Sequence, residues 1–174
     1  GEDGTIQGML EMLNIPYGVD IERFKPKQYG QITMRPIEFI YVGGVNEFKG
    51  ISYLLEAFKD IPSNEAHLTI GGGCNYLNRD NWKHENIRFT GKILHDEVAQ
   101  LLVEADVFVF PSLGDSYSLA AMEAAACGLP LIVTENTGMS DQMVDGQEGF
   151  VIPIQSVEAI KEKTGVDFKK IKSL

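Results

Sequence analysis

The sequence predicts an α/β domain built on a doubly wound parallel sheet. From Ile37 onward, segments of strand length alternate with segments of helical periodicity, and short connections join them. Several strand-like segments, such as Val107–Phe110, are uninterrupted apolar runs, as expected for parallel strands that are buried on both faces. The 174 residues suffice for one domain with a substantial core, and 44% of them are hydrophobic.

Residues 1–36 are predicted to form a helix and a linker-like arm, ahead of a single domain at residues 37–174. Thr5 is a candidate N-cap, and apolar residues follow it at helical spacing: Ile6, Met9, Leu10 and Leu13. This helix ends before Pro16, because proline disfavours helical backbone at the preceding residue. Residues 17–36 contain several glycines and prolines, which favours an arm outside the core.

The first half of the domain begins with the apolar run Ile37–Val42, which predicts a strand that ends at two glycines. Apolar residues at helical spacing predict a helix at Gly50–Lys59. Short strands are predicted at Leu68–Ile70 and Ile87–Thr90. The polar segment Cys74–Glu85 between them is expected to be a loop or a weak helix.

The second half continues the alternation. Apolar residues on one face predict a helix at His95–Glu104, and a strand follows at Val107–Phe110. A helix is predicted at Ser116–Cys127, because the next residue, Gly128, is a common C-terminal cap. The remaining predicted elements are two strands and a final helix: Leu131–Thr134, Gly149–Ile152 and Val157–Lys163.

Composition narrows the class of function. Asp and Glu total 25 against 15 Lys and Arg, which gives a formal charge of −10. Proteins that bind nucleic acids or anionic membranes usually present basic residues, so neither partner is expected. Two cysteines cannot form a disulfide framework, and no segment has the pattern of a signal peptide or the length of a membrane span. We therefore expect a cytoplasmic protein.

Ligands of doubly wound sheets bind in the loops that follow the strands, so these loops are the candidate site. In the first loop, Gly43 and Gly44 allow close approach of the backbone, and Lys49 could hold a phosphate near a helix N-terminus. A glycine-rich turn with a solvated lysine is the alternative, and this loop alone favours it. The glycines at Gly71–Gly73 could let a strand end meet a ligand without a side-chain clash. This loop lacks the spaced dinucleotide fingerprint, and three glycines alone do not outweigh the alternative, a plain turn.

The third loop contains Lys92, a possible positive charge, and the backbone of Lys92 and Ile93 could pair with a base edge. A simple turn that leads into the next helix explains this loop about equally well.

The fourth loop is the most informative. Asp115 is predicted to cap the helix that follows, and Glu123 lies about two turns further on roughly the same side. The backbone amides of Tyr117–Leu119 could then bind a diphosphate. The alternative is a capping aspartate with a solvated glutamate, but a carboxylate among the alanines of this helix is unusual for that role.

The other reactive residue types suggest no site. The three histidines, His67, His84 and His95, lack the spacing of metal ligands. Cys127 is expected to be a small core residue, and no serine lies in a nucleophile elbow.

Four stretches share a joint pattern: IPYGVDIERFKP, the segment Phe39–Phe58 with its Lys-Gly loop, ADVFVFPS, and MEAAACGLP. Together they resemble the C-terminal, donor-binding domain of retaining glycosyltransferases of GT-B fold (family 4, group 1), over about three quarters of the chain. The resemblance implies a Rossmann-like sheet that forms one half of a GT-B fold. It also implies a nucleotide-diphospho-sugar donor of UDP or GDP type and a role in carbohydrate biosynthesis.

The resemblance also implies roles for individual residues. Lys49, in the loop of Gly43 and Gly44, matches the lysine that neutralises the donor diphosphate. Glu123 matches the glutamate associated with the donor ribose, and Asp115 falls where a glutamate faces the donor sugar. The loop residues whose amides meet the phosphate and sugar are Ser116, Tyr117, Ser118 and Leu119. The backbone at Lys92 and Ile93 falls where the backbone of family members contacts the base of the donor nucleotide. Lys49 and Asp115 are thus the candidate catalytic residues, and neither a metal nor another cofactor is expected.

Two departures from the family pattern bear on activity. Asp115 is one methylene shorter than the usual glutamate, and Gly44 stands where the family often has arginine. We therefore expect a hexosyltransferase-type enzyme whose isolated domain is weakly active or inactive, since the acceptor glycan or lipid needs an N-terminal domain that about 36 residues cannot form. The full-length enzyme is expected in the cytoplasm or at the membrane periphery. The alternative is a non-catalytic α/β nucleotide-binding or interaction module.

Residues 1–17 resemble a segment of D-alanine–D-alanine ligases. No ATP-grasp machinery follows this segment, so the resemblance implies no function for the chain.

Overall fold

The computed structural model describes residues 18–26, 35–73 and 79–165, and these form a six-stranded sheet in the order β3-β2-β1-β4-β5-β6. Every neighbouring pair of strands is parallel. This order is that of a doubly wound, Rossmann-like domain, as the sequence predicts. The strands are β1 (Ile37–Val42), β2 (Ala66–Gly71), β3 (Ile87–Gly91), β4 (Val107–Phe110), β5 (Leu131–Thr134) and β6 (Gly149–Ile152).

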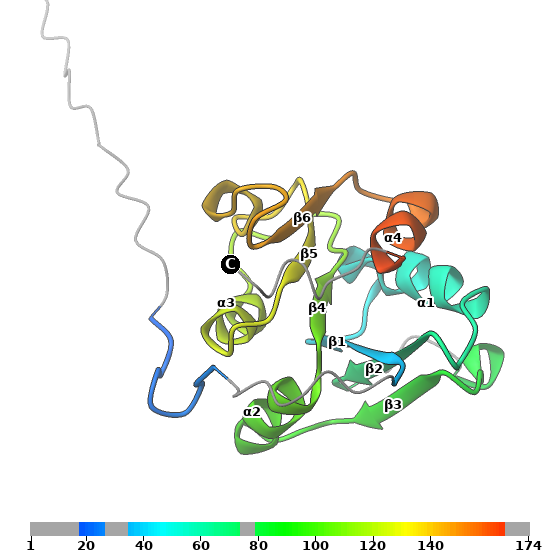
Figure 1. The fold of residues 1–174 in the computed structure, drawn as a ribbon, viewed down its shortest axis with the longest axis horizontal. Helices are drawn as coiled ribbons and strands as arrows, with labels where there is room; N and C mark the ends of the chain where they lie inside the picture. The colour runs from blue at the N-terminus through cyan, green and yellow to red at the C-terminus, as the bar shows by residue number, and fades with distance from the viewer. Residues whose placement is uncertain (1–17, 27–34, 74–78, 166–174) are drawn as a thin grey trace, which may run out of the picture.

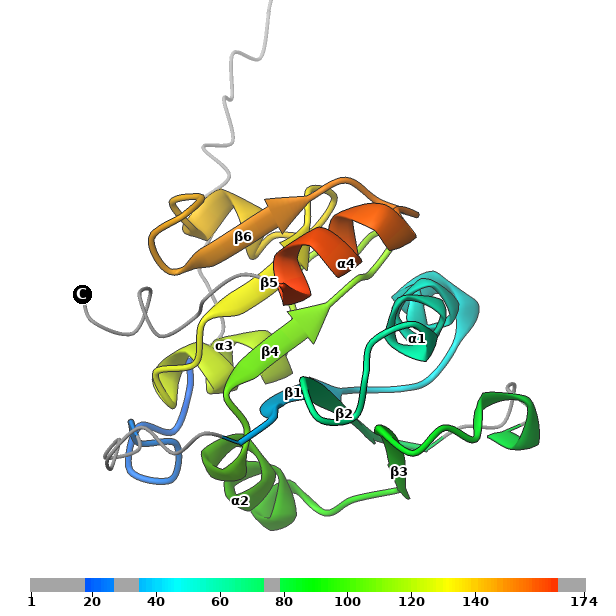
Figure 2. The same cartoon turned by 45° about the vertical axis from the view of Figure 1, so that its right-hand side comes forward.

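Helices cover both faces of the sheet (Figure 1). They are α1 (Ile51–Lys59), α2 (His95–Glu104), α3 (Leu119–Ala126) and α4 (Val157–Thr164). Figure 2 shows α1 and α4 together on one side and α2 and α3 on the other. This arrangement buries Phe39–Val42 of β1 and all four residues of β4, so the central strands form the core.

The strands and helices predicted from Ile37 onward are confirmed, with three short additions. Three-residue or four-residue 3-10 turns occur at Glu47–Lys49, Arg79–Trp82 and Ser140–Gln142. Turns of this length are too short to produce a hydrophobic period, so periodicity does not predict them.

The start of α3 differs from the prediction. The helix begins at Leu119 and not at Ser116, because the Ser118 hydroxyl accepts a hydrogen bond from the amide of Ala121 at 3.2 Å. A serine at this offset is a standard N-cap, so Ser118 has the capping role that the sequence analysis gave to Asp115.

The arm ahead of the sheet is only partly described. The predicted helix with its Thr5 cap lies outside the described residues. Within residues 18–26, the Asp20 carboxylate accepts from the amides of Glu22 and Arg23, which forms a tight turn. This turn places Phe24 in the core at 1% exposure, so the arm packs on the domain and is not outside the core throughout. No helix in the described parts of the chain is long and apolar enough to cross a membrane.

Candidate functional site

The candidate site lies where the order of the strands reverses. The central strands β1 and β4 are neighbours, yet the chain continues from them toward opposite edges of the sheet. The loops that follow these two strands therefore lie at the point where open α/β sheets bind their ligands. The two loops are residues 43–50 and residues 111–118.

The two loops are bonded to each other at their bases. The carbonyl of Phe48 accepts from the amide of Leu113 at 2.8 Å and from the hydroxyl of Ser112 at 3.1 Å. Gly50 has φ +64, and a Cβ atom at this position would lie 1.9 Å from the carbonyl oxygen of Pro111. Only glycine fits this close approach. Gly50 therefore allows the two loops to contact each other.

Lys49 and Asp115 meet across the reversal point. The Lys49 ammonium, at the end of the 3-10 turn after β1, pairs with the carboxylate of Asp115 in the loop after β4. Both side chains are largely shielded, with 26% and 16% exposure. The ammonium also lies 5.3 Å from the centre of the Phe110 ring. The structure thus joins two residues that the sequence analysis assigned to one site.

Asp115 holds its loop in place with its other groups. Its second carboxylate oxygen accepts from the amide of Tyr117 at 3.3 Å. Its backbone amide donates to the carbonyl of Asn136 at 3.1 Å, and its carbonyl accepts from Gly138 at 3.0 Å. The sequence analysis assigned the Tyr117 amide to a diphosphate, but in this structure that amide already donates to Asp115. The amides of Ser118 and Leu119 open the first turn of α3, where helical amides have no partner within the helix.

Tyr41 supports the first loop from below, and the sequence analysis did not identify it. Its side chain is fully buried, and its hydroxyl donates to the carbonyl of Gly44 at 2.8 Å. Burial raises the pKa of this phenol, and the nearby charge of Asp115 raises it further. The sequence does contain a signal for this role, namely a tyrosine within an apolar strand. Its hydroxyl needs a hydrogen-bond partner when it is buried.

The second glycine-rich loop packs against the first. Gly72 has φ +148, and a Cβ atom there would lie 1.9 Å from the carbonyl oxygen of Gly43. This contact favours the simpler interpretation of Gly71–Gly73, a turn that needs glycine for packing. The Ile93 side chain lies beside the same turn, since a Cβ atom at Gly71 would come within 3.0 Å of it. Lys92 is exposed at the end of β3, two strands from the reversal point.

Glu123 is buried on α3 with 5% side-chain exposure, so it is not the solvated residue of the alternative interpretation. One of its oxygens lies 2.6 Å from Nε2 of His95 on α2. The other nitrogen of His95 lies 2.8 Å from the Arg23 guanidinium. The sequence does not predict a role for His95, because helices α2 and α3 are adjacent only in space. Cys127 is buried as predicted, and burial followed by the charge of Glu123 raises the pKa of its thiol.

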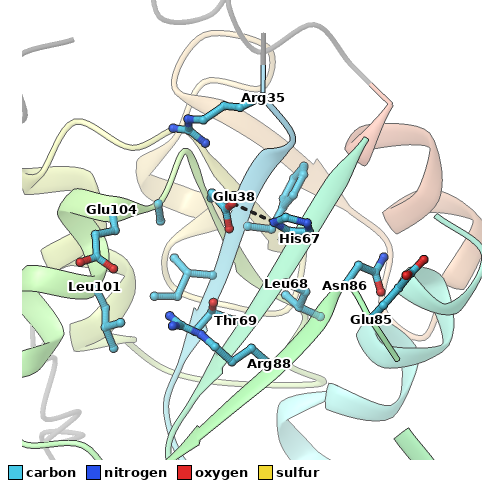
Figure 3. A pocket seen from close by; sticks show the side chains of 13 residues that line it. Arg35, Glu38, His67, Leu68, Thr69, Glu85, Asn86, Arg88, Leu101 and Glu104 are labelled. Atoms are coloured by element: carbon cyan, nitrogen blue, oxygen red, sulfur yellow. Dashed lines mark hydrogen bonds and ion pairs between the residues drawn. The ribbon is translucent and has the colours of Figure 1, made fainter. Parts of the chain in front are cut away.

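A separate hollow of about 570 Å³ lies beside α2, over the first halves of β1 and β2 (Figure 3). It contains the pair of Glu38 and His67, whose carboxylate oxygen and Nδ1 are 2.9 Å apart. None of the predicted site residues lines it. Because the strands point away from this hollow, the candidate site at their carboxyl ends is a different place on the domain.

Known proteins share both the sequence pattern and the fold. Residues 36–165 match the family described as Glycosyl transferases group 1. Glycogen synthase from Mycobacterium tuberculosis (strain H37Rv) is 30% identical over 150 residues, which are 82% of this chain and 36% of the synthase. The chain spans 35% to 40% of the length of the curated relatives compared with it.

Solved structures match over most of the chain. The C-terminal domain of a glycosyl transferase group 1 family protein (LpcC) from Francisella tularensis aligns with a TM-score of 0.74 and 22% identity, over 89% of this chain and 91% of that domain. Anabaena Alr3699/HepE in complex with UDP and glucose aligns with a TM-score of 0.73 and 15% identity, over 89% of this chain and 47% of that protein. The family match takes in all six strands and both loops of the candidate site. The chain therefore belongs to the group 1 glycosyl transferases.

Proposed function

We propose that this chain is the donor-binding domain of a retaining glycosyltransferase and that it binds a nucleotide-diphospho-sugar. The observation that carries the proposal is the position of Lys49, whose ammonium pairs with Asp115 in the loop that leads into α3. A lysine beside helical amides is a favourable environment for a diphosphate. The complex of HepE with UDP and glucose supports a donor of UDP type for a domain of this fold.

The proposed roles follow the arrangement of the residues. Lys49 and the amides of Ser116–Leu119 hold the diphosphate, whose negative charge grows as the sugar leaves. The Tyr117 amide must exchange its bond to Asp115 for one to the diphosphate. Glu123 binds the ribose, Asp115 faces the donor sugar, and the backbone at Lys92 and Ile93 meets the base. The proposal includes no metal ion, because the lysine and the amides supply the positive charge.

Asp115 competes with the donor diphosphate for the Lys49 ammonium. Its carboxylate pairs with Lys49, so a diphosphate must displace it or share the ammonium. Gly44 supplies no second cation to the site, and the chain as a whole has a net charge of −10. The site therefore has little positive charge to bind a diphosphate. We expect weak donor binding as a consequence.

Transfer of a hexosyl group to a glycan or lipid acceptor is proposed for a longer protein that adds an acceptor domain. The relatives are more than twice as long as this chain, which supports that division. Turnover by the isolated domain should be very low. No function is proposed for the ligase-like residues 1–17.

Calorimetry with UDP, GDP and ADP tests the proposal. We expect at least one of them to bind, and Lys49→Ala to weaken that binding about tenfold or more, because a charge-assisted contact is lost. Lys59→Ala is the matched control, since Lys59 pairs with Glu56 on the outside of α1 and lies 4.3 Å from the Trp82 ring centre. Absence of binding, or binding that Lys49→Ala leaves unchanged, would refute the proposal. Chelation with EDTA should not change the affinity.

A non-catalytic nucleotide-binding or interaction module is the second candidate, and the shortened Asp115 together with Gly44 favours it. Asp115→Glu separates the two. Tighter donor binding, or sugar transfer once an acceptor domain is supplied, supports the enzyme. No change in either supports the module.

A further inference from the structure

A chain of three polar side chains connects the arm to the candidate site. The Arg23 guanidinium lies 2.8 Å from Nδ1 of His95, and Nε2 of His95 lies 2.6 Å from the Glu123 carboxylate. The same guanidinium pairs with Asp96 at 2.9 Å, so both ends of its fork are engaged. These residues come from the arm, from α2 and from α3, which are distant in the sequence.

Arginine fixes the tautomer of this histidine. A guanidinium carries only donors, so Nδ1 of His95 must accept its hydrogen bond. The imidazole proton is then on Nε2, from which it is donated to Glu123. The ring is also held by packing, because its centre lies 5.4 Å from the centre of the buried Phe24 ring.

Glu123 needs this donor. Its side chain is 5% exposed and lies on a helix made mostly of alanine, and a buried carboxylate without a hydrogen bond is costly. Within the described part of the chain, His95 is the residue that donates to it, through one oxygen. A carboxylate has about four acceptor positions, so the second oxygen retains capacity for a hydroxyl group of a ligand.

We propose that His95 is a positioning residue that fixes the Glu123 carboxylate for the hydroxyl groups of the nucleoside, and that Arg23 of the arm sets the tautomer which makes this possible. The inference rests on the proposed function, in which Glu123 binds ribose. Its consequence is that the arm ahead of the sheet influences affinity for the nucleoside and leaves affinity for the diphosphate unchanged.

Two substitutions of His95 separate its two nitrogens. His95→Gln places an amide nitrogen near the position of Nε2 and can still donate to Glu123. His95→Asn places its amide near Nδ1 and is too short to reach that carboxylate. We expect His95→Gln to bind UDP within about threefold of the wild type and His95→Asn to bind about tenfold more weakly, with affinity for inorganic diphosphate unchanged in both.

The matched controls are His67→Gln and His67→Asn, since His67 also pairs with a glutamate but lies in the separate hollow. Arg23→Leu should weaken UDP binding in the wild-type background and have no effect in the His95→Gln background. The glutamine amide, unlike an imidazole, has no tautomer for Arg23 to select. The inference would be overturned if His95→Gln and His95→Asn lost equal affinity for UDP. It would also be overturned if a variant lost equal affinity for UDP and for inorganic diphosphate. Thermal unfolding of each variant identifies losses that arise from misfolding.

A nucleotide-free measurement separates this inference from the proposed function. Long-range ¹H–¹⁵N spectra of the histidine rings, assigned with His95→Gln, should show the Nε2–H tautomer for His95 in the wild type. Arg23→Leu should show a smaller share of it, because the Glu123 carboxylate alone then favours this tautomer. The Nδ1–H tautomer in the wild type would overturn the positioning role directly. If no nucleoside diphosphate binds the wild-type chain, the proposed function fails, and these spectra still decide whether Arg23 sets the tautomer.

Discussion

The Lys49 ammonium and the Asp115 carboxylate form an ion pair across the boundary between β1 and β4. Each residue belongs to a loop that follows one of these strands, and the bonded bases of the loops keep the two charges together. The pair stabilises the contact between the two loops, and it engages the cation that we assign to the donor phosphates. Under the proposed function, donor binding therefore competes with this ion pair.

Asp115→Asn should bind inorganic diphosphate about twofold to fivefold more tightly than the wild type, because it releases Lys49 from a partly shielded ion pair. Titration calorimetry at low salt measures this gain. The gain should disappear in the double variant with Lys49→Ala. Weaker binding by Asp115→Asn would show that the carboxylate supports the anion site and does not compete for it.

Ser118→Ala should lower the free energy of unfolding by about 1 kcal/mol through loss of the α3 cap, and it should also weaken UDP binding. Ser156→Ala is a matched control, because Ser156 caps α4 with a hydrogen bond of 3.1 Å from Ala159. Urea unfolding should show similar losses of stability, and calorimetry should show weaker UDP binding for Ser118→Ala alone. Equal affinities in the two variants would contradict a role for the α3 N-terminus in binding.

Gly50→Ala should lower the free energy of unfolding by about 3 kcal/mol or more, because the new methyl group adds a collision with Pro111 to the strain of a positive φ. Gly146→Ala isolates the strain, since Gly146 has φ +84 and nothing lies within 4 Å of its Cβ position. That control should lose about 1 kcal/mol. Urea denaturation compares the two, and equal losses would show that the loops separate easily.

Phe24→Ala should cost about 3 kcal/mol or more of unfolding free energy, because Phe24 is buried at 1% exposure although it belongs to the arm. Ile21→Ala in the same turn, at 69% exposure, should change it by no more than about 0.5 kcal/mol. If urea unfolding gave both variants wild-type stability, the arm would be a removable linker, as its composition suggests.

Tyr41 should make the fold sensitive to strong alkali. Burial raises the pKa of this phenol above its ordinary value of about 10, so the unfolded chain loses the proton at lower pH than the folded chain does. The stabilising effect is complete below about pH 10 and decreases as the pH rises further. Unfolding free energies measured across this range should fall less steeply for Tyr41→Phe than for Tyr53→Phe, which serves as the control. Parallel curves would contradict the shift.

The regular elements were predictable because their signals are local. Apolar runs such as Val107–Phe110 predict strands, and helical spacing predicts α1 and α2, and these segments appear with small changes at their ends. The start of α3 was less predictable, since Asp115 and Ser118 are both suitable caps. The structure decides between them, because Lys49 engages the aspartate and leaves the serine for the helix.

The contacts of the site were not predictable in the same way. Assignment of Lys49 and Asp115 to one site came from a family resemblance, and their ion pair depends on the adjacency of β1 and β4. The contact between His95 and Glu123 requires two helices to pack side by side, and Phe24 becomes buried only against the finished domain. The division of the chain at residue 37 and the role of Lys92 and Ile93 at the base remain predictions.

The order of the strands also has a consequence for how the site forms during folding. β1 pairs with β2 over a short stretch of chain, but its other partner, β4, comes much later in the sequence, with Phe39 opposite Val107. Pairs of high sequence separation form late, because a long loop must close before they are made. A partly folded chain with only β1, β2 and β3 in place would have Lys49 without Asp115. Under the proposed function, a nucleotide bound at the reversal point would therefore recognise only the fully folded domain, and its binding energy would add to the stability of the whole sheet.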